Sequence, residues 1–350
     1  MHSGKVSYQE SLARNVVALG QCVGCGTCVL TCPFDCLELI DEKPRLKKEC
    51  KVCGICARTC PRHLWSWSDA TKFVFGRERK PDEEFGVYRR FTVAQASDAR
   101  ILKVCQDGGV VTALLLFALE NGLVDGAIIA GTSPEKPLLP IPKLTTAGGE
   151  ILECAGTKYC YSPNILALAE VAKQKLTNLI FVGTACEIQA VRKMQMSGLK
   201  KYAASIKCLI GLMCSECFTY EGLMEKHIHE TLGLDLSGIR KMNIKGKMLV
   251  KTESGDTSIS LAEAKRFAKQ SCRFCDDFSS ELADVSCGGL GLNGWTFTIL
   301  RTEKGEELFS KAEKAGAVRT RKVNEDALAL SLLSRITKRK RQASSSRARH

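Results

Sequence analysis

Two stretches near the N-terminus hold eight cysteines in a repeated pattern. In each stretch three cysteines are separated by two residues, and a fourth follows after three more, directly before Pro33 or Pro61. This C-x2-C-x2-C-x3-C-P spacing is typical of bacterial ferredoxins with two [4Fe–4S] clusters, in which the fourth thiolate of each run binds the other cluster. It predicts one cluster on Cys22, Cys25, Cys28 and Cys60, and a second on Cys50, Cys53, Cys56 and Cys32. A pair of zinc sites is the alternative, which the doubled, proline-bounded pattern disfavours.

A second group of cysteines lies further along the chain at less regular spacing. Cys186 and Cys214 each follow a predicted buried strand, and Cys272 and Cys275 are separated by two residues. In an open α/β sheet, ligands gather outside the carboxyl ends of strands, so these four thiols suit a third [4Fe–4S] cluster. A lone C-x2-C pair also suits zinc or a redox disulfide, and spacing alone leaves those interpretations open. The remaining cysteines have no partner at ligand spacing, and we expect them to be structural: Cys36, Cys105, Cys154, Cys160, Cys208, Cys217 and Cys287.

Two glycine-rich segments each precede a predicted helix. The first is Gln106-Asp107-Gly108-Gly109, followed by Thr112, and the second is Gly156-Thr157-Lys158-Tyr159, followed by Ser162 and Asn164. Backbone amides at a helix N-terminus bind anions such as phosphate. An N-cap with a tight turn is the ordinary alternative for an isolated glycine pair. Neither segment matches a Walker A or G-x-G-x-x-G pattern, and no catalytic triad is evident.

Strands and helices alternate through the region that must position these residues. We expect helices at 110–120, 166–176, 187–196 and 219–233, and strands at 125–131, 179–182, 206–213, 248–252 and 295–301. This alternation predicts an α/β (α+β) domain with a mostly parallel sheet. We expect a small ferredoxin domain at 1–63, a linker at 64–90, the α/β domain at 91–335 and a basic tail at 336–350.

The composition is that of a soluble globular chain. Its 350 residues are 45% hydrophobic and 25% charged, which excludes collagen-like and wholly disordered classes. The apolar runs are too short for a membrane helix, and Met1–Glu10 lacks the apolar core of a secretory signal. In such a chain, 19 cysteines favour metal or redox chemistry over disulfides. We therefore expect a cytoplasmic protein, at most peripheral to the cytoplasmic side of a membrane complex.

Positive charge is concentrated at the C-terminus. The net charge is +13, and the last sixteen residues hold seven Lys and Arg and no acid. Such a block predicts a solvated, disordered tail. RNA binding is the alternative, but no aromatic residues accompany the charges, so we do not expect nucleic acid as a partner.

Several motifs taken together resemble one known family. They are Gln106–Gly109, Gly156–Tyr159, Cys186-x-x-Gln189-Ala190-x-Arg192, Gly211-Leu212-x-Cys214 and the stretch from Cys272 to Trp295, which contains Cys275-x-Asp277 and Ala283–Ser286. In order and spacing these are similar to beta subunits of coenzyme F420-dependent hydrogenases and dehydrogenases, over residues 91 to about 308. With the N-terminal cysteine repeat fused in front, the chain resembles the electron-input subunits that oxidise F420 in archaeal membrane F420 dehydrogenases. It is also similar to the N-terminal half of F420-dependent sulfite reductases.

The resemblance implies a flavoenzyme that holds FAD between coenzyme F420 and iron–sulfur clusters. Coenzyme F420 exchanges a hydride, whereas a [4Fe–4S] cluster accepts one electron, and a flavin can mediate between the two. The family's cluster ligands correspond to Cys186, Cys214, Cys272 and Cys275, with Cys217 and Cys287 as alternatives. Its FAD contacts correspond to Gln106, Asp107, Gly108, Gly109, Thr112, Thr157, Lys158, Tyr159, Ser162 and Asn164. The candidates for binding the anionic tail of F420 are Arg192, Lys193, Lys247 and Arg301, with Lys158 the strongest.

We therefore expect an electron-input subunit that oxidises reduced F420. A hydride would pass to FAD, and single electrons would then pass through three [4Fe–4S] clusters to a partner respiratory complex or a ferredoxin-like acceptor. The first alternative is the reverse reaction, reduction of F420 for a hydrogenase or another dehydrogenase. The second is a non-catalytic electron-transfer adaptor without flavin, which the intact glycine-rich segments disfavour.

Overall fold

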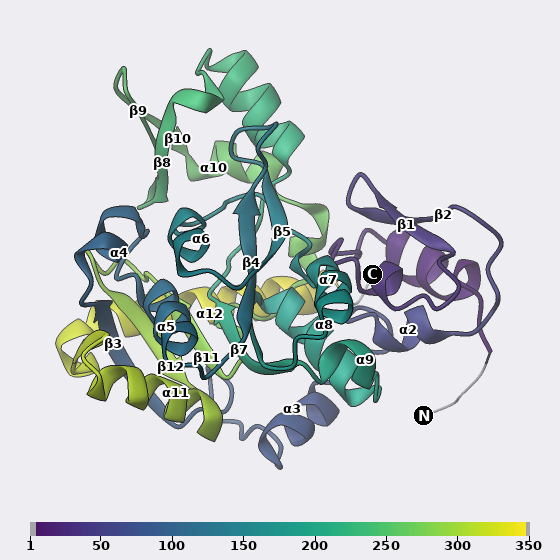
Figure 1. The fold of residues 1–350 in the computed structure, drawn as a ribbon. Helices are drawn as coiled ribbons and strands as arrows, with labels where there is room; N and C mark the ends of the chain where they lie inside the picture. The colour runs from purple at the N-terminus through teal and green to yellow at the C-terminus, as the bar shows by residue number, and fades with distance from the viewer. Residues whose placement is uncertain (1–4, 348–350) are drawn as a thin grey trace.

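The N-terminal residues form a small unit beside the main body of the molecule (Figure 1). The computed structural model describes residues 5–347, except for the side chains of residues 324, 325, 346 and 347. The unit contains η1 (Gln9–Val17), α1 (Thr27–Leu30), β1 (Leu37–Ile40), β2 (Lys43–Leu46) and α2 (Ile55–Thr59). Gly26 and Gly54 precede α1 and α2 with φ of 76° and 71°, a left-handed conformation that glycine adopts without strain. The buried hydroxyls of Thr31 and Thr59 lie 3.1 Å apart and join the two halves.

The main body is built on one eight-stranded sheet. Its strands are β3 (Arg90–Ala96), β4 (Gly126–Thr132), β5 (Pro140–Thr145), β6 (Leu179–Thr184), β7 (Ile206–Leu212), β11 (Val285–Gly288), β12 (Thr296–Leu300) and β13 (Val318–Arg321), in the order β13-β3-β12-β11-β7-β6-β4-β5. The pairs β11·β7, β7·β6 and β6·β4 are parallel. The outer pairs are antiparallel, so the expected parallel arrangement holds at the centre of a mixed sheet.

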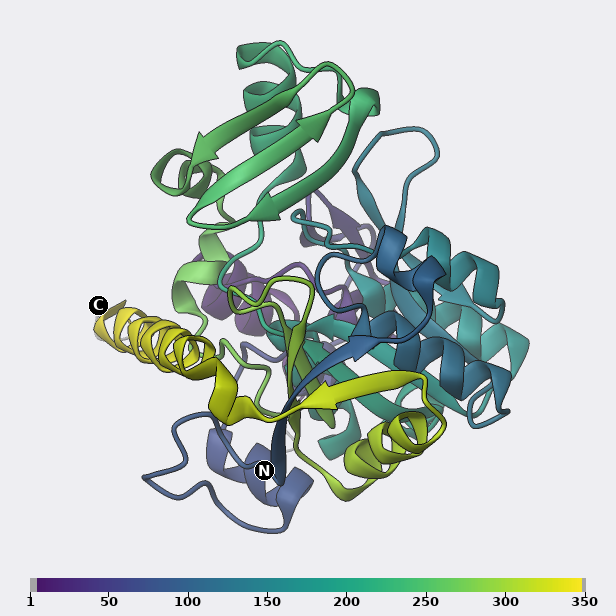
Figure 2. The same ribbon diagram turned by 90° about the vertical axis from the view of Figure 1, so that its left-hand side faces the viewer.

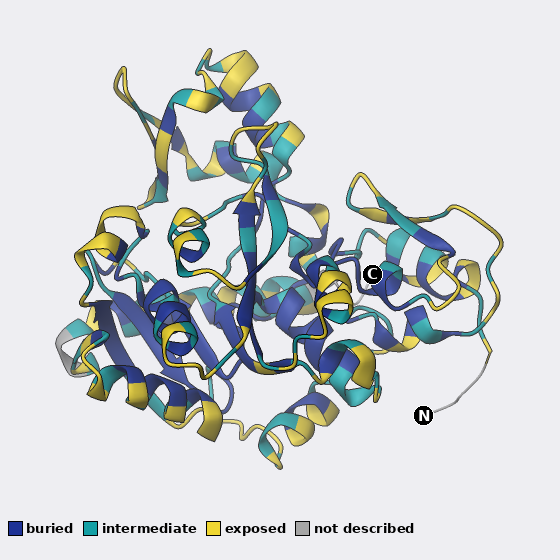
Figure 3. Ribbon diagram, in the orientation of Figure 1, coloured by how far each residue is buried: buried dark blue, intermediate teal, exposed yellow. Residues whose placement is uncertain are grey.

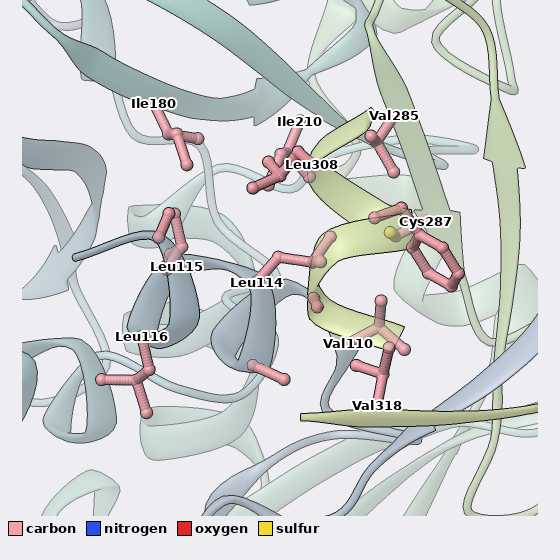
Figure 4. Packing of buried hydrophobic residues seen from close by; sticks show 14 of the residues in the cluster. Val110, Leu114, Leu115, Leu116, Ile180, Ile210, Val285, Cys287, Leu308 and Val318 are labelled. Atoms are coloured by element: carbon pink, nitrogen blue, oxygen red, sulfur yellow. The ribbon is translucent and has the colours of Figure 1, made fainter. Parts of the chain in front are cut away.

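Helices cover both faces of this sheet (Figure 1). One face carries α4 (Ala99–Val104), α5 (Val110–Glu120), α6 (Gly148–Glu153) and α11 (Glu303–Lys314), and the other carries η2 (Asn164–Ala167), α7 (Leu168–Gln174), α8 (Ala185–Met196) and α9 (Lys200–Ala203). Successive strand residues face opposite sides, so Ile180 packs with Leu114 and Leu308 (Figure 4), whereas Phe181 packs with Ile188. The sheet and the inner helix faces are buried (Figure 3), as a near-continuous apolar run in a central strand predicts.

A separate lobe projects from the main body (Figure 2). It contains η3 (Tyr220–Thr231), η4 (Leu236–Gly238), β8 (Ile239–Ile244), β9 (Lys247–Thr252), β10 (Asp256–Ser260), α10 (Leu261–Ala264) and η5 (Lys265–Phe267), and η6 (Gln270–Phe274) leads back to the main body. The three strands form an antiparallel sheet of order β10-β9-β8. Met224, Ile228, Met248 and Val250 form its own buried core.

Most expected elements of the α/β region are confirmed. The helix at 110–120 is α5, and the strands at 125–131, 179–182, 206–213 and 295–301 correspond to β4, β6, β7 and β12 within two residues. The helix expected at 166–176 is divided into η2 and α7. The edge strands β5 and β13 and the inner strands β3 and β11 were not predicted.

Two segments are more ordered than the sequence predicts. The linker at 64–90 contains α3 (Trp67–Phe75), and Trp67 donates from Nε1 to Asp276 at 2.7 Å. At the other end of the chain, η7 (Val323–Asp326) leads into α12 (Ala327–Arg347). The basic tail, expected to be disordered over 336–350, is therefore helical as far as Arg347, and its last three residues lie outside the described part of the chain. Ala329, Leu333 and Thr337 recur every four residues and are buried, so one face of α12 packs against the protein despite the charge on the other. No helix in the described part of the chain is long and apolar enough to cross a membrane.

Candidate functional site

A cavity of ≈ 260 Å³ lies at the carboxyl ends of the central strands. Val182–Thr184 at the end of β6, Leu212 at the end of β7 and Gly288 at the end of β11 line it. This is the position at which ligands bind in open α/β sheets. Eight of the expected FAD contacts also line it: Gln106, Asp107, Gly109, Thr112, Thr157, Lys158, Ser162 and Asn164. We call this space the central cavity.

The first glycine segment positions α5 against this cavity. Gly109 is the N-cap of α5 with φ of 72°. Gly108 is tightly enclosed, because a Cβ there would lie 2.6 Å from the carbonyl oxygen of Ala94. Gly108 and Tyr159, both expected FAD contacts, are not among the residues that line the cavity. The Gly108 amide instead donates to Oγ1 of Thr296 at 3.1 Å, and Tyr159 packs against the core of the lobe.

Lys158 reaches back into the loop that precedes it. Its Nζ donates to the carbonyl oxygens of Cys154, Ala155 (3.2 Å) and Gly156 (3.5 Å), and so caps the C-terminal end of α6. Burial lowers the pKa of the Lys158 ammonium. Lys158 thus lines the cavity while its donors are already used within the protein.

A buried polar network forms another wall of the cavity. Ser162 donates to Oδ1 of Asn164 at 2.6 Å, and Asn164 donates from Nδ2 to the Val182 carbonyl at 3.0 Å. The Glu187 carboxyl accepts from the backbone amides of Asn164 (2.9 Å) and Thr184 (3.1 Å). Burial raises the pKa of Glu187 to about 8. Sequence reasoning missed Glu187, although a Thr-x-x-Glu capping box at the start of an expected helix was a detectable signal.

The second group of expected cluster ligands meets around one small cavity. It is lined by Cys186, Cys214, Cys217, Cys272 and Cys275, which we call the inner cysteine set. Cys186 is in the first turn of α8, Cys214 follows β7, and Cys272 lies in η6. The fold therefore assembles residues 186 to 275 as the strand-end argument predicts.

Cys217, expected to be structural, belongs to this set. Its Sγ lies 3.8 Å from that of Cys214, and its amide donates to Sγ of Cys272 at 3.4 Å. The hydrogen bond from Cys217 lowers the pKa of Cys214 to about 7. Cys287, the other alternative ligand, lines only the central cavity among these spaces.

Three cations that the sequence analysis did not identify also line the inner cavity: Lys269, which forms an ion pair with Glu42, and Arg62 and Lys340. Burial acts to lower the pKa values of Arg62 and Lys340. The neighbouring cysteines, chiefly Cys275, outweigh this effect, so that both pKa values are raised above the ordinary ones. Nε and Nη2 of Arg62 are buried with no hydrogen-bond partner. Arg62 and Lys340 come from opposite ends of the chain, so no local pattern could place them beside the cysteines.

The N-terminal unit holds two further cysteine-lined cavities. One is lined by Cys22, Cys25, Cys28 and Cys60, and the other by Cys32, Cys50, Cys53 and Cys56 together with Cys36. The grouping exchanges the fourth cysteine of each run, as the spacing predicts. Burial raises the pKa of Cys25 to about 11 and that of Cys60 to about 12. Buried thiols of this kind are held as thiolates when iron supplies the compensating charge, so the donor set fits iron–sulfur clusters.

The cavities follow one another and share lining residues. The central and inner cavities share Tyr161, Thr184 and Cys217. The inner cavity and the first N-terminal cavity share Val23 and Arg62. Within residues 5–347, no three His, Cys, Asp or Glu side chains meet closely enough to bind a single metal ion. Instead, each group of thiols surrounds a small cavity of its own.

Apart from Lys158, the basic residues considered for the F420 tail do not line the central cavity. Arg192 forms a buried ion pair with Asp284 at 3.0 Å, and Arg301 donates to Ser279, Ser286 and the carbonyl oxygens of the 85–87 segment. Lys193 donates to the His63 and Leu64 carbonyl oxygens, and Lys247 is exposed on β9. Arg192, Arg301 and Lys193 therefore have structural roles, because their side chains bind partners within the protein.

Comparison with known proteins identifies the family. Residues 91–169 match the N-terminal region, and residues 176–326 the C-terminal region, of the family described as "Coenzyme F420 hydrogenase/dehydrogenase, beta subunit". The coenzyme F420 hydrogenase subunit beta of Methanothermobacter thermautotrophicus is 36% identical over 262 residues, covering 73% of this chain and 92% of the relative. The coenzyme F420-dependent sulfite reductase of Methanocaldococcus jannaschii is 32% identical over 315 residues, covering 86% of this chain and 47% of the relative.

A solved structure agrees with these sequence matches. A chain in the F420-reducing [NiFe] hydrogenase complex from Methanosarcina barkeri superimposes with a TM-score of 0.72 at 34% identity, covering 76% of this chain and 92% of that chain. Both family matches together span most of the main body and the lobe. This chain therefore belongs to the coenzyme F420 hydrogenase/dehydrogenase beta-subunit family.

Proposed function

We propose that this chain oxidises reduced coenzyme F420 and delivers the electrons singly through its cysteine-lined cavities to a partner. FAD held in the central cavity would supply the step from hydride to single electrons. The inner cysteine set and the two N-terminal sets would each hold one [4Fe–4S] cluster. The observation that carries this proposal is the order of the cavities, in which neighbours share residues from the central cavity to the N-terminal unit.

The chain's own residues have defined tasks in this proposal. Gly109 and the amides at the start of α5 would bind the anionic part of the flavin, because a helix N-terminus attracts phosphate. Ser162, Asn164 and Glu187 hold the end of β6 and the start of α8 in place. This fixes Cys186 relative to the central cavity. Tyr161 lies between the central and inner cavities and excludes water from the path.

The partner is proposed to be another member of an electron-transfer complex. The relatives named above include a hydrogenase subunit beta and a chain of a hydrogenase complex. The second N-terminal cavity is the natural exit, because the exposed Phe34 and Val52 lie next to its cysteines in the sequence. Reduction of F420 by electrons entering at this exit uses the same residues in reverse and is the second candidate. An experiment that adds either reduced F420 or a low-potential donor separates the two directions.

Replacing one inner cysteine tests the route. Cys272→Ser should remove about 4 of about 12 iron atoms per chain, retain FAD, and still reduce the flavin with reduced F420. Transfer from flavin to the N-terminal clusters should stop. Cys208→Ser is the matched control, because Cys208 is buried in β7 and lines none of the cavities. If Cys272→Ser reduced an external ferredoxin at the wild-type rate, the route would be rejected.

The neighbouring pair Cys214 and Cys217 requires its own comparison. The family pattern assigns the ligand to Cys214, so Cys214→Ser should lose the inner iron and Cys217→Ser should keep it. The reverse result would transfer the ligand role to Cys217, whose Sγ is only 3.8 Å away. Iron content and the electron paramagnetic resonance (EPR) signal of the reduced protein measure both variants.

A further inference from the structure

The C-terminal helix α12 covers the inner cysteine set. The family match ends at residue 326 and α12 begins at Ala327, so the helix lies outside the region that defines the family. Its buried residues Leu333 and Thr337 hold it against the protein. Beyond them, the same helix reaches η6, which carries Cys272.

Two residues of α12 bind the backbone around the inner cysteines. Lys340 donates from Nζ to the carbonyl oxygen of Cys214 at 2.6 Å and to that of Asp277 at 3.1 Å. Ser344 donates to the carbonyl oxygen of Phe274 at 3.1 Å. One helix face thus connects the loop after β7 with the segment around Cys275.

The ammonium of Lys340 lies beside the inner cysteines and interacts electrostatically with Cys275, Cys214 and Cys272. Within the described residues, Lys340 forms no ion pair with a carboxylate, whereas nearby Glu281 is paired with Arg341 and Arg79. Asp276 accepts from Trp67, and the buried Asp277 accepts from the Glu281 amide. Arg62 brings a second cation to the same cavity, with Nε and Nη2 buried and unpartnered, whereas the ammonium of Lys269 there is paired with Glu42.

We propose that α12 is a cap on the inner cysteine set and that Lys340, assisted by Arg62, raises the reduction potential of the cluster bound there. The proposal rests on the proposed function, because it needs a cluster on these cysteines. Adding one electron makes such a cluster more negative, and a nearby buried cation stabilises the reduced form more than the oxidised form. Net charge, hydrogen bonds and solvent exposure are the factors by which a protein sets cluster potentials. Lys340 is thus a positioning residue that favours electron flow from the flavin side.

The test is a potentiometric titration of the purified, cluster-loaded protein followed by EPR. The inner cluster is identified as the signal that disappears in Cys272→Ser. Lys340→Met keeps the length of the side chain and removes its charge, and should shift this signal to a more negative midpoint potential with iron and FAD content unchanged. Lys340→Arg should stay near the wild-type potential. Lys338→Met is the control. Lys338 lies on the same helix, at an exposed site where its ammonium faces Glu84, so its replacement should leave the potential unchanged.

The outcomes separate this inference from the proposed function. A third cluster whose potential is the same in wild type and Lys340→Met would overturn the role of Lys340 while leaving the proposed function intact. A wild-type chain with no third cluster would overturn the inner step of the proposed function itself. If Lys340→Met loses the inner iron, Arg62→Met provides the second measurement. A negative shift there supports the charge effect, and an unchanged potential contradicts it.

Discussion

The N-terminal and inner cysteine sets reach similar surroundings by different routes. In the N-terminal unit, each cavity takes three cysteines from one short run that ends in a helix and one from the other half of the repeat. The inner set takes its cysteines from the start of α8, the end of β7 and η6, three elements far apart in the chain. A site of the first kind is encoded by spacing, whereas one of the second kind depends on the packing of the whole sheet. Changes to the core should therefore affect the inner set first.

The largest effect is expected from the buried ion pair between Arg192 on α8 and Asp284, which precedes β11. Asp284 accepts from Arg192 (3.0 Å), the Leu209 amide (2.7 Å) and Thr302 (2.7 Å). Asp284→Ala leaves Arg192 as an uncompensated buried charge and should destabilise the main body by about 3–5 kcal/mol. Urea unfolding with iron analysis should show the inner iron lost before the N-terminal iron. The exposed Asp256→Ala is the control, and simultaneous loss of all iron would contradict the comparison.

A glycine at the contact between the two regions is expected to have the next largest effect. A Cβ at Gly26 would lie 2.6 Å from Cδ2 of Leu166 in the main body, whereas Gly76, with a similar positive φ, has nothing within 4 Å. Gly76→Ala should cost about 1 kcal/mol from backbone strain alone. Gly26→Ala should cost more, because Leu166 must move as well. Thermal unfolding measures both, and equal costs would show that the contact with Leu166 is unimportant.

Lys269 holds the two regions together by charge. Its Nζ donates to the Val23 carbonyl at 3.1 Å and to Glu42 at 2.5 Å, and it lies 4.0 Å from the centre of the Tyr161 ring. Lys269→Met should loosen the N-terminal unit by about 1–3 kcal/mol, the usual range for a buried charged hydrogen bond. Faster proteolysis within residues 64–90 is the measurement. Lys265→Met, which removes a more exposed ion pair with Glu216, should leave the cleavage rate unchanged.

The smallest effect is expected at the central cavity. Because Nζ of Lys158 already binds three backbone carbonyl oxygens, Lys158→Ala should loosen the loop after α6 by about 1 kcal/mol. We expect a lower fraction of bound FAD after purification, while KM for F420 is unchanged once FAD is restored. A raised KM at full flavin content would place Lys158 at the F420 tail instead.

The sequence predicts what depends on local pattern and little of what depends on distant contacts. The helix at 110–120, the central strands and the exchange of Cys32 and Cys60 follow from periodicity and spacing. Cys217, Arg62 and Lys340 reach the inner cavity only through tertiary packing. Arg192 and Arg301, whose charge suggested a ligand, are buried among internal partners. The tail at 336–350 was expected to be disordered because of its block of positive charge, whereas the helix that contains it as far as Arg347 is held by Ala329 and Leu333, which precede the tail, and by Thr337.

The number of clusters tests the central claim most directly. The wild-type chain, reconstituted without oxygen and saturated with FAD, is analysed for iron and titrated with reduced F420 while its EPR spectrum is recorded. We expect about 12 iron atoms per chain, and three cluster signals that reduced F420 can generate. About 8 iron atoms or fewer at full FAD content, with only the N-terminal signals present, would contradict it.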